Sequence, residues 1–133
     1  MRYLLDTNII SDLIRNPEGA VAQRIAEVGH ANVLTSIIVA SELRFGAAKK
    51  ASPKLTERVD GILKRISVMT FEAPADIYYR NMRAALESQG RVISENDLLI
   101  ASHAMTLGCT LVTANMREFA RVDGLKCENW LAE

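Results

Sequence analysis

Three carboxylates, Asp6, Glu42 and Asp97, are the residues whose types and positions point most directly to chemistry. Carboxylates that gather in one place repel each other, so one takes up a proton unless a cation holds the group together. The set contains no His or Cys, and hard divalent ions such as Mg²⁺ or Mn²⁺ prefer ligand sets made of oxygen. Because such ions activate water and steady a leaving oxygen, the residues point to metal-assisted hydrolysis of a phosphodiester.

Each of these residues also has a purely structural explanation. Asp6 fits the N-cap of the helix that follows it. Asp97 lies three residues after Ser94, the spacing of a capping box. A lone Glu42 on a helix is typical of a solvated surface, and Asn115 after an apolar run is typical of a turn. Taken singly these residues leave both interpretations open, and only their joint placement favours a site.

The elements that must position these residues are short. Apolar runs predict strands at 3–5, 33–35, 67–69, 110–112 and near 125–127, and helical spacing of apolar residues fills the gaps. We expect Ser36 to cap a helix and Pro74 to begin a long one. Strands that alternate with helices predict an α/β fold: a three-layer α/β/α domain with a central parallel sheet of four to five short strands, residues 1–133 forming one domain.

In open α/β sheets of this kind, ligands bind beyond the carboxyl ends of the strands. Asp6 directly follows the first strand, Glu42 lies in the helix after the second, and Asp97 opens the helix before the fourth. Thr113 and Asn115 follow the fourth strand. If strands one, two and four are neighbours, these side chains converge at one edge of the sheet.

Composition excludes several classes of protein. The 133 residues carry 16 Lys+Arg against 16 Asp+Glu, a net charge of zero. This balance argues against binding of nucleic acid through a high net positive charge. Its apolar runs are too short for a secretory leader or a membrane span, so we expect a cytoplasmic location. Cys109 and Cys127 lack metal-ligand spacing and are interpreted as small buried hydrophobes.

Four blocks in order resemble the motifs of PIN-domain ribonucleases, and among them the VapC-type toxins of bacterial toxin–antitoxin pairs. The resemblance covers essentially the whole chain and also includes its closing residues 122–125 and 128–130. The four blocks are Leu-Asp-Thr-Asn at 5–8, Ser-Glu-Leu-Arg-Phe-Gly-Ala at 41–47, Asn-Asp-Leu-Leu-Ile-Ala at 96–101, and Leu-Val-Thr-Ala-Asn at 111–115 with Arg-Glu-Phe at 117–119.

The resemblance implies a PIN-like fold in which Asp6, Glu42 and Asp97 hold one or two Mg²⁺ or Mn²⁺ ions, directly or through water. A metal-bound water would attack RNA and leave a 5′-phosphate and a 3′-hydroxyl. Many PIN domains carry a fourth acidic residue where this chain has Asn115, and Glu118 is a nearby alternative that could equally face solvent. The looser candidates for groups that orient water or ligands are Thr7 and Thr113.

The resemblance also implies partners. VapC-type toxins cleave structured RNA, often tRNA, form homodimers, and bind a VapB-type antitoxin through an amphipathic segment that can push a basic side chain into the acidic pocket. Apolar residues that could meet an antitoxin, or could equally be core, are Ile9, Ile10, Leu13 and Phe45. Candidate contacts to the RNA backbone are Lys49, Lys50, Lys54, Arg80, Arg83 and Arg91.

Two other classes compete with a ribonuclease. A catalytically silent PIN module would bind RNA or protein without cutting, and the intact acidic trio argues against it. A receiver-like Mg²⁺-binding signalling domain would need an acceptor Asp after the third strand, where the sequence reads Ser67-Val68-Met69-Thr70. The acidic residues favour metal-assisted hydrolysis, and the resemblance implies an Mg²⁺- or Mn²⁺-dependent endoribonuclease toxin that inhibits translation.

Overall fold

The computed structural model describes residues 1–131 and contains a parallel sheet of five strands in the order β3-β2-β1-β4-β5. In the central register, Leu4 of β1 lies between Leu34 of β2 and Leu111 of β4. The first, second and fourth strands are thus neighbours, as the convergence of the site residues requires. The strands are β1 Tyr3–Leu5, β2 Val33–Ser36, β3 Ser67–Met69, β4 Thr110–Val112 and β5 Cys127–Glu128.

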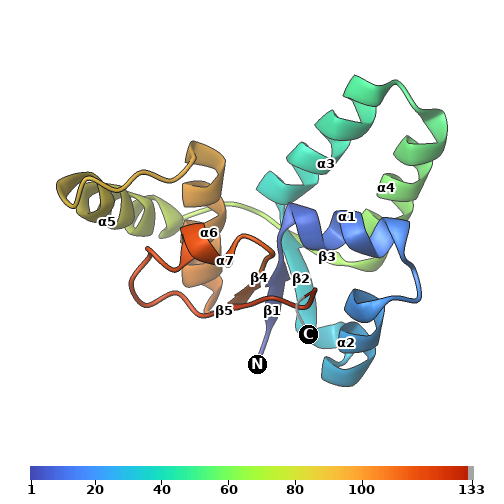
Figure 1. Ribbon diagram of the computed structural model, residues 1–133, viewed down its shortest axis with the longest axis horizontal. Coiled ribbons are helices and arrows are strands. Elements are labelled where there is room, and N and C mark those ends of the chain that lie inside the picture. Colours follow the sequence, from blue (N-terminus) through green and yellow to red (C-terminus); the bar gives the residue numbers. More distant parts are fainter. Residues whose placement is uncertain (132–133) are drawn as a thin grey trace.

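Helices cover both faces of this sheet, which confirms the three-layer α/β/α prediction. Figure 1 shows α1, α2 and α4 on one side and α5 and α6 on the other, with α3 and α4 paired in an arm that projects beyond the sheet. The helices are α1 Thr7–Arg15, α2 Ala20–Val28, the 3₁₀ turn η1 His30–Asn32, α3 Ile37–Lys50, α4 Pro53–Arg65, α5 Ala75–Ser88, α6 Glu95–Leu107 and α7 Met116–Phe119.

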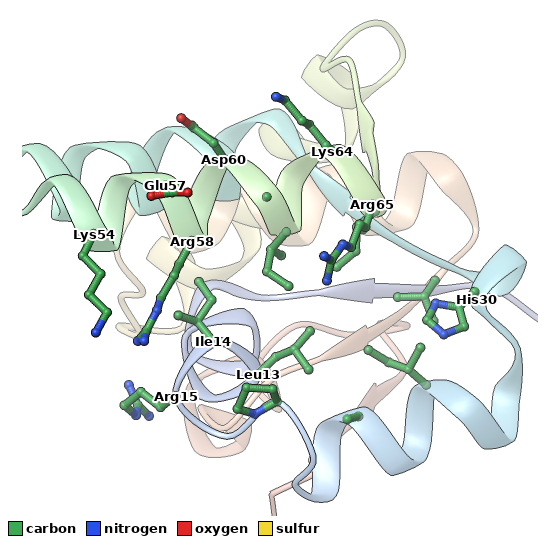
Figure 2. Close-up of a pocket in the computed structure, with 17 residues that line it drawn as sticks. Leu13, Ile14, Arg15, His30, Lys54, Glu57, Arg58, Asp60, Lys64 and Arg65 are labelled. Carbon is green, nitrogen blue, oxygen red and sulfur yellow. The ribbon is translucent and has the colours of Figure 1, made fainter.

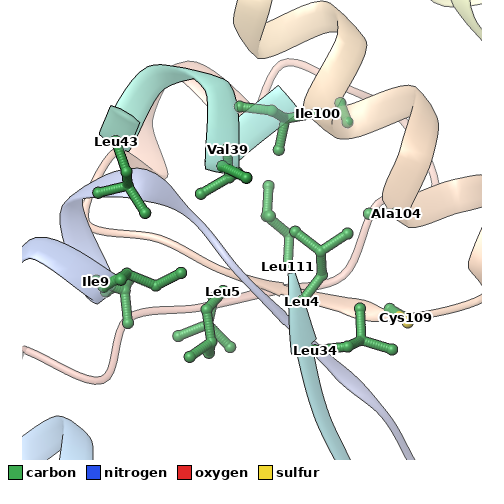
Figure 3. Close-up of a cluster of buried hydrophobic side chains, with 14 of the residues drawn as sticks. Leu4, Leu5, Ile9, Leu34, Val39, Leu43, Ile100, Ala104, Cys109 and Leu111 are labelled. Atoms are coloured by element: carbon green, nitrogen blue, oxygen red, sulfur yellow. The ribbon is translucent and has the colours of Figure 1, made fainter. Parts of the chain in front are cut away.

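Continuous apolarity of the strands follows from this double cover, because both faces of the central strands are buried. Leu4, Leu5 and Leu111 are fully buried. Figure 3 shows these leucines between Ile9 of α1 and Ile100 of α6, which contribute from the flanking helices. The core therefore fixes the strand ends from which the polar residues emerge.

Side-chain caps turn the chain from strand to helix at the carboxyl edge of the sheet. The Asp6 side chain accepts from the Thr7 amide at the start of α1, and Ser36 accepts from the Ile38 amide at the start of α3. Ser94 accepts from the Asp97 amide at the start of α6. These caps set the directions of the three helices that carry or follow the acidic residues.

The last strand differs from the prediction. A strand was expected near 125–127, but β5 comprises only Cys127 and Glu128, which pair with Leu111 and Val112. Gly124 adopts a positive φ of 82° just before it, so the chain is still turning at Leu125. Because β5 is an edge strand, Cys127 is half-buried, whereas Cys109 is buried as expected. Within residues 1–131, no helix is both long and apolar enough to cross a bilayer.

Candidate active site

The predicted acidic residues converge in one open cleft at the carboxyl edge of the sheet. Asp6 follows β1, Glu42 lies in the second turn of α3, and Asp97 lies in the first turn of α6. The cleft has a volume of about 710 Å³. Its lining consists of Asp6, Thr7, Asn8, Ser11, Arg15, Glu42, Phe45, Asn96, Asp97 and Asn115.

Asp6 is at once a helix cap and a buried member of the cleft, so its two interpretations are compatible. One carboxylate oxygen, Oδ1, accepts from the Thr7 amide at 2.8 Å, and the other, Oδ2, accepts from the Thr113 hydroxyl at 2.7 Å. The residue is only 4% exposed. Burial raises the pKa of Asp6 above its usual value, although the bonds from Thr113 and Thr7 oppose this shift.

Glu42 is held in place and is not a freely solvated helix residue. Its Oε1 accepts from the Thr7 hydroxyl, and its Oε2 accepts from the side-chain amide of Asn96 at 3.0 Å. These bonds connect α3 to the first turns of α1 and α6. Sequence reasoning did not single out Asn96, whose signal was its position directly before Asp97.

The pKa of Asp97 is raised by burial and by the neighbouring carboxylates. Burial, followed by the negative charges of Asp6 and Glu118, raises its pKa to about 6. Its Oδ2 lies 3.4 Å from the side-chain nitrogen of Asn115. The same nitrogen donates to Glu118 at 2.7 Å, so Asn115 bridges two carboxylates. Asn115 is therefore more than a turn residue.

Glu118 lies beside the acidic group and remains partly exposed. Its Oε1 accepts from the Ser94 amide at 3.0 Å, and its Oε2 accepts from Asn115, so two hydrogen bonds hold the side chain next to the site. Partial burial acts to raise the pKa of Glu118, but the hydrogen bonds from Ser94 and Asn115 outweigh it and the net pKa is lowered.

The chemistry of this donor set fits a hard divalent cation, since three carboxylates and several neutral oxygen groups line one cleft and Glu118 lies next to them through Asn115. Among the described residues, however, no three His, Cys, Asp or Glu side chains lie close enough together to coordinate a single ion. The carboxylates are instead engaged by hydroxyl and amide donors. Coordination would require these side chains to exchange hydrogen bonds for an ion.

A larger groove of about 990 Å³ lies between α1, α2 and α4 and adjoins the acidic cleft at Arg15. Figure 2 shows Leu13 and Ile14 on its floor, with Lys54 and Arg58 reaching from α4 toward α1. Its lining includes both acidic and basic side chains, and the acidic ones form no cluster. The groove therefore lacks the cluster of carboxylates that characterises the acidic cleft.

The candidate contact residues divide between the core and the surface. Ile9 and Ile10 are fully buried and Leu13 is 9% exposed, so these three belong to the core, which is one of the two alternatives that the sequence left open. Phe45, by contrast, is 68% exposed. None of the six candidate RNA contacts lines the acidic cleft, whereas Arg15, which sequence reasoning missed, does.

His103 is a further residue whose position the sequence did not reveal. It is fully buried, and its Nδ1 lies 2.7 Å from the hydroxyl of Ser36, the residue that caps α3. The ring also stands edge-on to Phe71, with centroids 5.3 Å apart. His103 thus joins α6, which carries Asp97, to the start of α3, which carries Glu42.

Comparison with known proteins agrees with the fold. The family model of the PIN domain matches residues 3–125. The chain therefore belongs to the PIN-domain family, and the resemblance drawn from its motifs is confirmed.

Within that family its relatives are VapC proteins. The chain is 38% identical over 132 residues to "Ribonuclease VapC2" of Rickettsia felis, which spans 98% of both chains. It is 36% identical to "tRNA(fMet)-specific endonuclease VapC" of Shigella flexneri, again over 98% of each. These names agree with the predicted ribonuclease class.

Solved structures of VapBC proteins also match this chain. The structure of VapBC2 from Rickettsia felis bound to a promoter DNA fragment matches with a TM-score of 0.90, at 38% identity and with 98% of this chain and 99% of that chain covered. The DNA-bound VapBC of Salmonella typhimurium matches with a TM-score of 0.91, at 31% identity and 98% coverage of both chains.

Proposed function

We propose that this chain, acting as one domain, is a metal-dependent endoribonuclease and the toxin of a VapBC-type toxin–antitoxin pair. The observation that carries the proposal is the convergence of Asp6, Glu42 and Asp97 in a single cleft of a PIN-domain chain. Glu118 would serve as the fourth acidic residue, because the side-chain nitrogen of Asn115 lies between the carboxylates of Glu118 and Asp97.

The division of roles follows from the contacts. Asp6, Glu42, Asp97 and Glu118 would hold one or two Mg²⁺ or Mn²⁺ ions, which supply an activated water and stabilise the leaving oxygen when bound. The Thr113 hydroxyl orients Asp6. Thr7 and Asn96 orient Glu42 from opposite sides and keep its carboxylate in the cleft.

Structured RNA, with tRNA as the first candidate, is the proposed substrate. The relative from Shigella flexneri is named a tRNA(fMet)-specific endonuclease, and the chain is 31% identical to a Salmonella typhimurium protein of the same name. Unpaired loop bases are the part of such RNA that a protein reads most readily. Inhibition of translation would follow from the loss of an intact tRNA.

A VapB-type antitoxin is the proposed protein partner, in a hetero-oligomer built on a toxin homodimer. Support comes from the solved VapBC complexes that this chain resembles. The groove between α1, α2 and α4 adds a physical reason, since an apolar floor beside Lys54 and Arg58 suits an amphipathic helix with acidic side chains.

The direct test is cleavage of RNA by the purified chain. We expect Mg²⁺ or Mn²⁺ to support cleavage of tRNA to 5′-phosphate and 3′-hydroxyl ends, EDTA to stop it, and Asp6→Asn to abolish it while leaving the circular dichroism spectrum unchanged. Asn retains the helix cap, which makes this variant a clean test of charge. Binding of RNA without cleavage by the wild type would instead identify a silent PIN module.

A further inference from the structure

Phe45 is an exposed aromatic residue at the rim of the acidic cleft. Its side chain is 68% exposed, and among the described residues it is the one aromatic that is not at least partly buried. The side of α3 that faces the core is formed by Val39, Leu43 and Ala47. Phe45 therefore contributes little to the core, and its exposure calls for another explanation.

The position of Phe45 ties it to the chemistry. It lies three residues after Glu42 on α3, so the two side chains are neighbours on one helix face. Every other residue that lines the cleft is polar or charged, and Arg15 is the one cation among them in the described chain. The cleft thus combines carboxylates, one aromatic face and one guanidinium.

These groups match the parts of a nucleotide. Carboxylates with an ion engage the scissile phosphate, and a guanidinium pairs with a neighbouring phosphate. A base that leaves its stack needs an apolar surface, and an exposed aromatic ring supplies one to any of the four bases. The acidic groups of the cleft cannot do this, because they carry no apolar face.

We propose that Phe45 is a substrate-positioning residue that stacks on an unpaired base next to the bond that is cut. This inference rests on the proposed ribonuclease function. It assigns no chemical step to Phe45: the ring holds the nucleotide so that its phosphate lies over Asp6, Glu42 and Asp97. Removal of the ring should therefore weaken binding of the RNA and the alignment of its phosphate.

The test compares wild type, Phe45→Ala and Phe45→Trp on an RNA oligonucleotide that contains the mapped cleavage site. Base–aromatic stacking predicts a loss in kcat/KM of roughly 5- to 150-fold for Phe45→Ala. Phe45→Trp should recover most of the activity, since it restores an aromatic face. Ile77→Ala removes another exposed apolar side chain, on α5 and outside the cleft, and should leave cleavage unchanged.

A second substrate series identifies the base. Abasic sites are placed one at a time on either side of the scissile phosphate, and each oligonucleotide is cut by wild type and by Phe45→Ala. At the stacked position, loss of the base should slow the wild type and leave the variant unaffected, so the two losses do not add. Fully additive losses at every position would overturn the proposal.

Two results separate this inference from the function on which it rests. If the wild type cuts no RNA, the proposed function has failed. If the wild type cuts and Phe45→Ala cuts equally well, only the role of Phe45 has failed. Weaker binding of the antitoxin by Phe45→Ala, with cleavage unchanged, would assign the ring to a protein contact and would also overturn the proposal.

Discussion

The acidic cleft should cost stability when no cation is bound, and Asp97→Asn measures that cost. The pKa of Asp97 rises from 3.8 to about 6 on folding, through burial and then through the charges of Asp6 and Glu118. Two pH units correspond to an upper limit of about 3 kcal/mol at neutral pH. The side chain is only half-buried, so solvent screening reduces this to about 1 kcal/mol.

One opposing effect lowers the expected gain. Asp97 lies in the first turn of α6, where a negative charge is favourable by about 0.3–1 kcal/mol, and Asn loses this interaction. Without metal at pH 7.5 we therefore expect Asp97→Asn to be more stable than wild type by about 0.5 kcal/mol in urea denaturation. The variant should at the same time be unable to cut RNA.

The sign of the pH dependence makes this prediction specific. A folded pKa above the unfolded one means that the wild type loses stability as the pH rises from about 4 to about 6. Below about pH 3 the carboxyl is protonated in both states, so wild type and variant should be equally stable. Added Mg²⁺ should then stabilise the wild type more than the variant. A wild type that is the more stable protein without metal at pH 7.5 would refute this reasoning.

Three further predictions follow from other contacts. Thr113→Val removes the hydroxyl that donates to buried Asp6, so it should lower the stability by about 1–3 kcal/mol and slow cleavage of RNA, as urea denaturation and a cleavage assay would show. Burial lowers the pKa of His103, so the folded protein favours the neutral ring and loses stability as the pH falls below 6.5. The urea midpoint of His103→Gln should therefore fall less between pH 7 and pH 5 than the midpoint of the wild type. Asn115→Asp turns the donor that bridges Glu118 and Asp97 into a fifth repelling charge, so calorimetry should find a lower melting temperature without metal and tighter binding of Mn²⁺.

The sequence predicted the fold well because its signals are local. The run Tyr3-Leu4-Leu5 is apolar and ends at the carboxylate of Asp6, and Ser36 caps the helix where expected. The exception is the last strand, since an edge strand of two residues has too short a pattern to locate from apolar periodicity. Its bounds depend on pairing with Leu111 and Val112.

The site was predictable in its carboxylates and less so in its supporting residues. Asp6 follows a strand, and Glu42 and Asp97 lie in the first two turns of helices at the same edge of the sheet, so the topology brings the three together. The role of Asn96 and the direction of Glu118 depend on side-chain hydrogen bonds between distant segments, and no spacing in the sequence encodes these. The sequence also did not reveal which apolar side chains are exposed. Ile9 and Phe45 are both apolar residues on helices, but Ile9 is fully buried and Phe45 is exposed.

Direct binding of Mn²⁺ would show whether these carboxylates form a cation site. Titration of the purified chain, followed by the electron paramagnetic resonance signal of free Mn²⁺, should show one or two bound ions per wild-type chain, and Mg²⁺ should displace them. Asp6→Asn should bind Mn²⁺ far more weakly and remain folded. A wild type that binds no Mn²⁺, or an Asp6→Asn variant that binds it equally well, would show that these carboxylates form no cation site.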